Sequence, residues 1–227
     1  MKRPLEKSDR NKAAQAEIDA AVKDMETQVQ QRLRETDHAH ADRLCERYRN
    51  LVPAERVQRI RDLPTSFQGH EDFERSRKES GVQEPDDGTK VVGFSRYTLE
   101  PAHVDMADPQ VEKTAIHERM HQLSDPRAEG ILGEKLYEGA TEDLAIKELG
   151  REPNPELPRS YPQGRAAAQE LRKMCGDNAV DRTYFQGDSG DLRACLDRRL
   201  GKGSLKELEN KANAECSQER LERDDRD

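Results

Sequence analysis

The stretch that decides the fold reads Thr114-Ala-Ile-His-Glu-Arg-Met-His-Gln-Leu123. Within it, His117-Glu118-x-x-His121 sets two histidines four positions apart. On an α-helix, residues at this spacing lie on one face, about 6 Å apart along the axis, so both imidazoles can bind one metal ion. The spacing therefore predicts a helix that carries a metal centre, with Glu118 beside the metal.

A second polar segment, Tyr137-Glu-Gly-Ala-Thr-Glu142, lies downstream and offers a carboxylate as a third ligand. Three protein ligands with a fourth position left to water form an open zinc site of the catalytic kind. Glu118 is then placed to take the proton of a zinc-bound water as a general base. Together the two segments predict a zinc-dependent hydrolase.

Local patterns place these segments on neighbouring helices. Asp108-Pro109 is a suitable start for the helix that carries the histidines, and Ser124-Asp-Pro126 ends it. A second helix is predicted from about Glu134 to Leu149, with Gly150 as its C-terminal cap. Because a short Gly-containing connection joins the two helices, they should be antiparallel, which returns Glu138 toward the histidines.

Residues 1–63 predict a helical arm. Residues 8–36 form one helix by pattern, and its narrow apolar stripe is expected to bury against one neighbour; the stripe consists of Ile18, Val22, Met25, Val29 and Leu33. Residues 37–42 break the pattern and are expected to start a second helix that runs through Leu51. Pro53 then opens a third, short helix.

Residues 64–89 carry Pro, Gly, Ser and charges with no apolar period, which predicts a long surface loop or linker. Residues 90–99 are β-branched and aromatic and predict a strand, ended by Pro101. The zinc domain is expected to span residues 90–203, and residues 204–227 a charged C-terminal helix or tail.

Within the second half of the expected domain, residues 151–164 hold four prolines and predict an extended crossing rather than a helix. Helices are predicted at residues 166–175 and 192–200. The segment Tyr184-Phe-Gln-Gly-Asp-Ser-Gly190, rich in Gly and Asp, is expected to separate them as a non-helical connection.

The composition is unusually polar, with 32% hydrophobic and 38% charged residues, 4% aromatics and no Trp. A chain this polar cannot bury its whole length, so we expect one compact region with long exposed helices around it. The net charge of -8 argues against nucleic acid as the main partner. No apolar run approaches the roughly 20 residues of a membrane span, and the N-terminus lacks the apolar core of a signal peptide. We therefore expect a protein made in the cytoplasm, with export only through a dedicated secretion or injection system.

The cysteines are Cys45, Cys175, Cys195 and Cys216, with no C-x-x-C pair among them. A structural zinc knuckle is therefore not expected. Free thiols are the favoured interpretation, and a Cys175–Cys195 bridge across a helical hairpin is the alternative if the protein reaches an oxidising compartment.

The two polar segments resemble the gluzincin metallopeptidases, which place H-E-x-x-H on one helix and a ligand Glu on a following one. Glu138-Gly-Ala-Thr-Glu142 looks like the Glu-Gly-x-Thr-Glu turn of several gluzincin branches. The resemblance implies a mainly α (α+β) fold: a zincin-like helical domain with a small edge sheet, preceded here by the helical arm. It implies zinc ligands His117, His121 and Glu138, with Glu142 hydrogen-bonded to a ligand histidine.

By the same resemblance, the protein is expected to hydrolyse peptide bonds of a protein substrate. A tyrosine from a later helix or loop should stabilise the oxyanion. Tyr184 is favoured over Tyr161, because the segment around it could reach a cleft. Tyr137 is expected to pack, and the strand at 90–99 to flank an extended substrate. Arg119 departs from the family, which prefers an uncharged residue there, and it implies a wetter back to the helix.

The architecture, a compact zinc domain with accessory helices, also resembles bacterial toxin or effector metallopeptidases, whose inhibitor, immunity or delivery partner could bind the N-terminal helices. Two other interpretations stay open. One is a non-catalytic helical binding module in which the motif is accidental or metal-free, and the other is a structural zinc site or an enzyme that has lost its activity. The remaining histidines are expected to be non-ligands. His38 and His40 should be solvated, His70-Glu-Asp-Phe-Glu74 a loop, and His103 a surface or packed residue.

Overall fold

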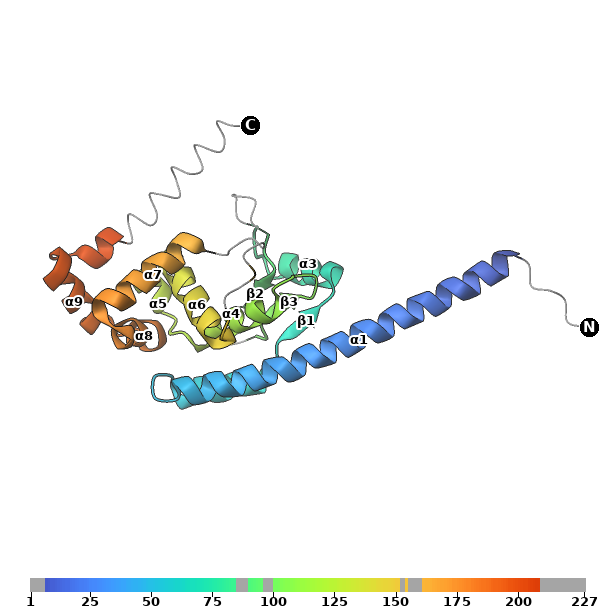
Figure 1. Ribbon diagram of the computed structural model, residues 1–227, viewed down its shortest axis with the longest axis horizontal. Helices are drawn as coiled ribbons and strands as arrows, with labels where there is room; N and C mark the ends of the chain where they lie inside the picture. The colour runs from blue at the N-terminus through green and yellow to red at the C-terminus, as the bar shows by residue number, and fades with distance from the viewer. Residues whose placement is uncertain (1–6, 85–89, 96–99, 152–153, 155–160, 209–227) are drawn as a thin grey trace, which may run out of the picture.

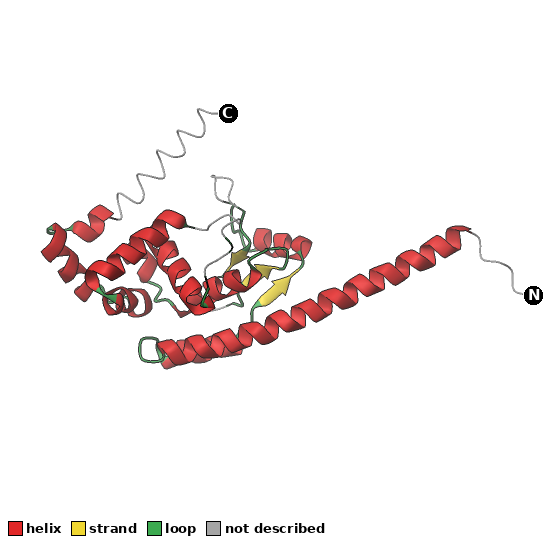
Figure 2. Cartoon of the chain, viewed as in Figure 1, coloured by secondary structure: helices red, strands yellow, loops and turns green. Residues whose placement is uncertain are grey.

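The computed structural model describes residues 7–84, 90–95, 100–151, 154 and 161–208. This part of the chain is mainly helical with a small three-stranded sheet, as the sequence predicts (Figure 1, Figure 2). None of the described helices combines the length and the apolar character that a bilayer crossing requires. Residues 209–227, the larger part of the expected C-terminal tail, lie outside the described residues.

The N-terminal helix α1, Lys7–Tyr48, is continuous over 42 residues, so the break expected at residues 37–42 is wrong. Asp37 and His40 interrupt the apolar pattern of the sequence but not the helix, because both side chains are buried against polar partners on the motif helix. Helix α2, Ala54–Asp62, packs against α1, as expected for a short helix that opens after Pro53.

The apolar stripe of α1 does not bury against a neighbour as expected. Its exposed fractions are 55% at Ile18, 49% at Val22, 65% at Met25 and 47% at Val29. Only Leu33, the last member, packs against the body of the molecule. The N-terminal half of α1 therefore projects from the body as a single helix (Figure 1).

The small sheet has the order β1-β3-β2, with strands β1 (Ser66–Gln68), β2 (Gly93–Phe94) and β3 (His103–Asp105). The central strand β3 runs parallel to β1 and antiparallel to β2. Phe67 of β1 and Val104 of β3 are buried against the start of the motif helix. The sheet therefore supports that helix at its N-terminal end.

Residues 64–84 are not the loop that their polarity predicts, since they hold β1 and helix α3, His70–Glu79. Phe73 anchors α3 because its side chain is fully buried. The strand expected at residues 90–99 is shorter in the described residues, where only β2 is found, and residues 96–99 lie outside them.

The helices after the sheet are α4 (Val111–Leu123), α5 (Ala128–Leu132), α6 (Glu134–Leu149), α7 (Pro162–Cys175), α8 (Asp177–Gln186) and α9 (Gly190–Leu200). The motif helix α4 and its partner α6 agree with the predicted helices, and Gly150 ends α6 in the left-handed conformation at φ 72°. Helices α5 and α8 occupy segments for which connections were expected.

Helix α7 begins at Pro162, four residues before the predicted start. Proline fits the first turn of a helix, where its missing N–H is not needed. Most of the crossing expected before it, residues 152–153 and 155–160, lies outside the described residues.

One large apolar core unites most of these helices. It includes Leu44 and Tyr48 of α1, Ile116 of α4, Leu144 of α6 and, beyond α9, Leu205. The second half of α1 thus belongs to the same core as the motif helix.

Cys175 and Cys195 form a disulfide that joins the end of α7 to α9, so the favoured interpretation as free thiols is wrong for this pair. Cys45 is free and buried. The fold brings two cysteines together across a helical hairpin, which spacing alone could not establish.

Candidate metal centre

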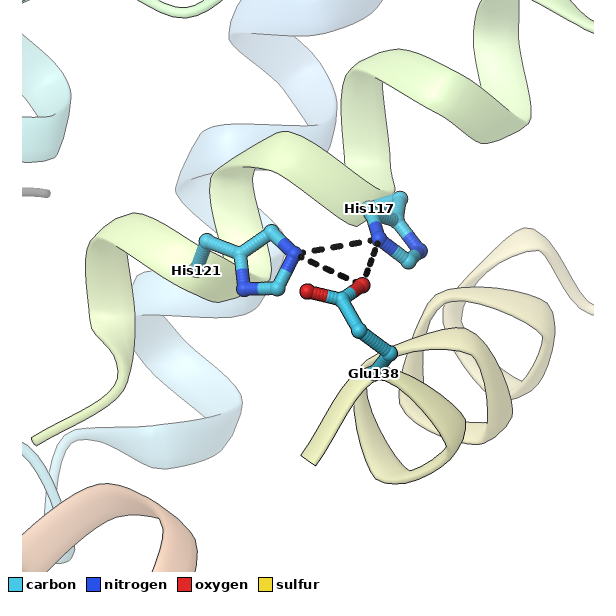
Figure 3. Close-up of side chains that lie close together, drawn as sticks. All are labelled: His117, His121 and Glu138. Carbon is cyan, nitrogen blue, oxygen red and sulfur yellow. Dashed lines mark hydrogen bonds and ion pairs between the residues drawn. The ribbon is translucent and has the colours of Figure 1, made fainter. Parts of the chain in front are cut away.

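Three potential ligand atoms converge between α4 and α6 (Figure 3). The Nε2 atoms of His117 and His121 are 3.1 Å apart. Glu138 Oε2 lies 3.2 Å from His117 Nε2 and 3.3 Å from His121 Nε2. The structure therefore brings together the three residues that the sequence and the resemblance name as ligands.

The spacing of these atoms fits a tetrahedral zinc ion. Zinc binds imidazole nitrogen and carboxylate oxygen at about 2.0–2.2 Å, and a tetrahedral angle then separates two ligand atoms by about 3.3 Å. The three observed separations of 3.1, 3.2 and 3.3 Å approach this value. His121 and Glu138 are only partly buried, so one side of the cluster is open.

A closed circuit of hydrogen bonds fixes the tautomer of His121. Ser124 Oγ donates to the backbone oxygen of His121 at 2.8 Å, which uses its only proton. Ser124 Oγ must therefore accept from the Tyr137 hydroxyl at 2.7 Å, and that hydroxyl must accept from His121 Nδ1 at 2.9 Å. Nδ1 thus carries the proton, and Nε2 presents a lone pair toward Glu138.

His117 is oriented in the same sense by a carboxylate. Its Nδ1 lies 3.1 Å from Glu142 Oε2, and a carboxylate can only accept, so Nδ1 carries a proton. Lys113, itself buried, donates to Glu142 at 3.0 Å and balances its charge. The resemblance implies this contact of Glu142 with a ligand histidine.

Two imidazole nitrogens and one carboxylate oxygen therefore face one another, an arrangement that favours a cation between them. When that cation is a proton, it resides on His117. Burial alone would lower the pKa of His117, but the hydrogen bonds to Glu138 and Glu142 outweigh it and raise the pKa to about 10. The donor set thus fits a zinc ion, which would displace this proton.

The carboxylates of the site divide into two kinds. Burial would raise the pKa of Glu138, but its close contacts with His121 and His117 hold that pKa well below its usual range. The pKa of Glu142 is lowered for the same reason, with His117 and Lys113 as the opposing groups. Glu118 differs, because burial raises its pKa more than the two histidines lower it. Such a carboxylate is a stronger base than an exposed one.

Glu118 lies against the edge strand β2. A methyl group added at Gly93 would come within 3.1 Å of Glu118 Oε1 and 2.5 Å of Thr114 Cγ2. Only glycine therefore fits at this point, and the strand holds the Glu118 side chain in a narrow space between α4 and the sheet.

Comparisons of this chain with protein-family models, characterised proteins and solved structures find no match. The gluzincin resemblance accordingly rests on the residues of the two polar segments and stays a prediction.

The structure does not bring Tyr184 to the metal cluster. Tyr184 lies inside α8, is fully buried, and its hydroxyl is 2.7 Å from Thr141 Oγ1. Its ring stacks on Tyr137, one layer behind the ring that contacts His121. The preference for Tyr184 therefore fails, because Tyr184 lies within α8 and the non-helical connection is confined to residues 187–189.

Tyr161 instead covers the site. Its ring stacks on His117 with centroids 5.8 Å apart and planes 12° from parallel, and the residue remains 46% exposed. Partial burial and the charges of Glu138 and Glu118 raise the pKa of Tyr161, which keeps its hydroxyl a neutral donor. Among the described residues other than glycine, only Tyr161 has a positive φ, 49°, a strained conformation that often marks a functional position.

A close helix crossing sets Tyr161 in this place. A methyl group added at Gly139, next to Glu138, would lie 1.9 Å from the backbone carbon of Gly164. Helices α6 and α7 therefore touch backbone to backbone, three residues after Tyr161. No sequence pattern predicts this role of the two glycines. Tyr137, which was expected only to pack, also accepts a hydrogen bond from His121.

Arg119 does not give α4 a wet back, as its charge predicts. It is 1% exposed, and its guanidinium donates to both carboxylate oxygens of Asp37 at 3.1 and 2.5 Å and to the backbone oxygen of Ile60 at 2.9 Å. The motif helix is thus bound to α1 through the residue between its two histidines.

The other histidines lie outside the cluster, although not all where expected. His40 is buried and bonds Glu112 at 3.0 Å, so its expected solvation is wrong. His38 is exposed, as predicted. His70 begins α3 rather than a loop and lies 2.6 Å from Asp105, and His103 packs on the ring of Phe94.

Proposed function

We propose that this protein is a zinc-dependent metalloendopeptidase that hydrolyses peptide bonds of a protein substrate. The observation that carries the proposal is the convergence of three ligand atoms, two imidazole nitrogens and one carboxylate oxygen, each within 3.3 Å of the others. A buried carboxylate on the motif helix and a half-exposed tyrosine over His117 supply two further groups that such a reaction needs.

Zinc held by His117, His121 and Glu138 would act as a Lewis acid that polarises a substrate carbonyl and acidifies the attacking water. Glu118 accepts the proton of that water, which its raised pKa favours, and delivers it to the leaving amine. Tyr161 donates its hydroxyl proton in a hydrogen bond to the developing oxyanion. Glu142 and Tyr137 hold the two imidazoles in the required tautomer.

The disulfide supports a place of action outside a reducing cytoplasm, since such bonds persist in oxidising surroundings. We therefore also propose that the protein is exported from the cell that makes it and acts as a toxin or effector.

Zinc content measured by elemental mass spectrometry tests the metal centre. We expect about one zinc per wild-type chain and a loss in Glu138→Ala. Glu134→Ala is the matched control, because Glu134 is an exposed carboxylate in the first turn of the same helix. A wild-type chain that takes up no zinc after reconstitution would refute the metal centre and favour the non-catalytic binding module.

Hydrolysis of an unfolded protein substrate tests the chemistry. Glu118→Gln should retain zinc and lose about 10²–10⁴-fold in rate, the usual contribution of a general base. Tyr161→Phe should lose about 10²–10³-fold in kcat, whereas Tyr184→Phe should remain near wild type. Full activity of Glu118→Gln would contradict the proposed mechanism, although the zinc site itself could still be present.

A further inference from the structure

The exposed half of α1 carries a continuous apolar stripe without a neighbour in the described part of the chain. Ile18, Val22, Met25 and Val29 recur at i, i+4, i+7 and i+11, which places them on one face of the helix. Each side chain is between 47% and 65% exposed. The helix first touches the body at Gln30, whose amide donates to Phe67 O at 3.3 Å.

The charges around this stripe are mostly negative. Between residues 13 and 31 the charged side chains are four carboxylates and one cation, namely Glu17, Asp19, Asp24, Glu26 and Lys23. All five are exposed, and within the described residues none of the carboxylates forms an ion pair. Asp19 and Asp24 accept hydrogen bonds from the neutral amides of Gln15 and Gln28, so both carboxylates remain open to a cationic side chain of a partner.

The carboxylates are placed where a second helix would meet them. Asp19 and Glu26 precede Val22 and Val29 by three residues and therefore border the stripe on one side. On the other side lies Ala21, whose small side chain lets a second helix approach closely. The face thus has an apolar centre and an acidic border.

A second copy of this chain does not complement such a face. In an antiparallel pair that aligns all four apolar residues, Asp19 of one copy lies opposite Glu26 of the other, so like charges meet. In a parallel pair the border carboxylates meet Ala14 and Ala21, which carry no charge. The chain's own last residues, Leu221-Glu-Arg-Asp-Asp-Arg-Asp227, are also acidic on balance and offer no match.

We propose that residues 14–29 of α1 bind a basic amphipathic helix of another protein, whose apolar side chains cover the stripe and whose Lys or Arg side chains pair with the carboxylate border. This docking surface is independent of the metal centre, and its existence does not depend on catalysis.

The test uses the full chain and two synthetic helical peptides of about three heptads, both with Leu at the stripe-facing positions. One peptide carries Lys at the flanking positions and the other carries Glu. Titration calorimetry at low salt should show the Lys peptide binding about tenfold or more tightly than the Glu peptide, and high salt should reduce the difference. Equal affinity, or no binding of either peptide, would overturn the proposal.

Variants on the exposed half locate the surface without touching the core. Val22→Ser with Met25→Ser should abolish binding of the Lys peptide and leave the helix content by circular dichroism unchanged. Asp19→Lys with Glu26→Lys should reverse the preference in favour of the Glu peptide. Retained binding in the serine variant would overturn the location, and dimerisation of the wild-type chain that the serine variant lacks would assign the stripe to a second copy.

Discussion

Residues 12–29 and residues 37–48 belong to the same helix, yet the first segment exposes apolar side chains and the second buries polar ones. The first segment exposes Val22 and Met25, while the second buries Asp37 and His40. The difference follows from what each segment contacts. The first segment has no neighbour in the described part of the chain. The second packs against the motif helix α4, where Arg119 donates to Asp37. Burial along α1 is therefore decided by tertiary partners and not by the polarity of the sequence.

The largest expected effect comes from removing the buried carboxylate. Asp37→Ala should lower the free energy of unfolding by about 3–5 kcal/mol, because it leaves the Arg119 guanidinium buried and unpaired. Glu26→Ala, in the exposed half of the same helix, should change it by less than about 0.5 kcal/mol. Urea denaturation of both variants measures the contrast. Similar small changes in the two would show that the Asp37–Arg119 pair is dispensable.

The apolar residues of the two segments provide the next comparison. Leu44→Ala should cost about 2–5 kcal/mol because Leu44 is fully buried in the main core. Val22→Ala should leave the free energy of unfolding within about 0.5 kcal/mol of wild type, since the side chain is already half exposed. A large loss in Val22→Ala would mean that the stripe is covered in solution.

Two glycines near the candidate metal centre differ in the same way, because Gly139 is closely packed and Gly130 is not. Gly139→Ala should cost about 1–3 kcal/mol, because the added methyl group meets the backbone of Gly164. It should also displace Tyr161 and reduce kcat of the proposed reaction, with zinc content retained. Gly130→Ala is the control, because nothing lies within 4 Å of the added methyl group. An equal response of the two variants would contradict the close crossing of α6 and α7.

The smallest effect concerns local opening of α1. Amide hydrogens of residues 12–29 should exchange with solvent much faster than those of residues 37–48, because few tertiary contacts oppose opening of the exposed half. Hydrogen-exchange mass spectrometry resolves the two segments. Equal protection would indicate a bound partner or self-association.

The elements nearest the motif could be predicted because their signals are local. The spacing of His117 and His121 requires a helix, and Gly150 marks the end of the next one. Glu138 could be placed because the helices on either side of a short connection are antiparallel. The chemistry of the candidate ligands is thus encoded within some 30 residues.

The surroundings of the site could not be predicted in the same way. Tyr161 reaches His117 only through the crossing at Gly139 and Gly164, two positions in separate helices. The tautomer of His121 depends on Ser124 and Tyr137, which look like a helix stop and a packing residue in the sequence. Such roles depend on contacts between residues far apart in the sequence. Helix propensity and the period of apolar residues carry no information about these contacts.

The break predicted at residues 37–42 and the loop predicted at residues 64–89 were wrong for the same physical reason. In both places, charged residues suggest solvent, but the fold supplies partners for some of them. Asp37 accepts hydrogen bonds from Arg119 and Thr65, and His70 forms a hydrogen bond with Asp105. Secondary structure then continues through sequence that looks irregular.

Because α1 is one continuous helix, its length fixes the distance between its two ends. At 1.5 Å per residue, its 42 residues extend about 63 Å, and no glycine or proline interrupts them. A polypeptide held at Val22 lies about 22 Å along the axis from Asp37, where the helix meets α4. An extended chain needs about seven residues to span that distance. The length of this helix therefore sets a minimum separation between a segment captured on its exposed half and any segment of the same polypeptide that reaches the junction of α1 with α4.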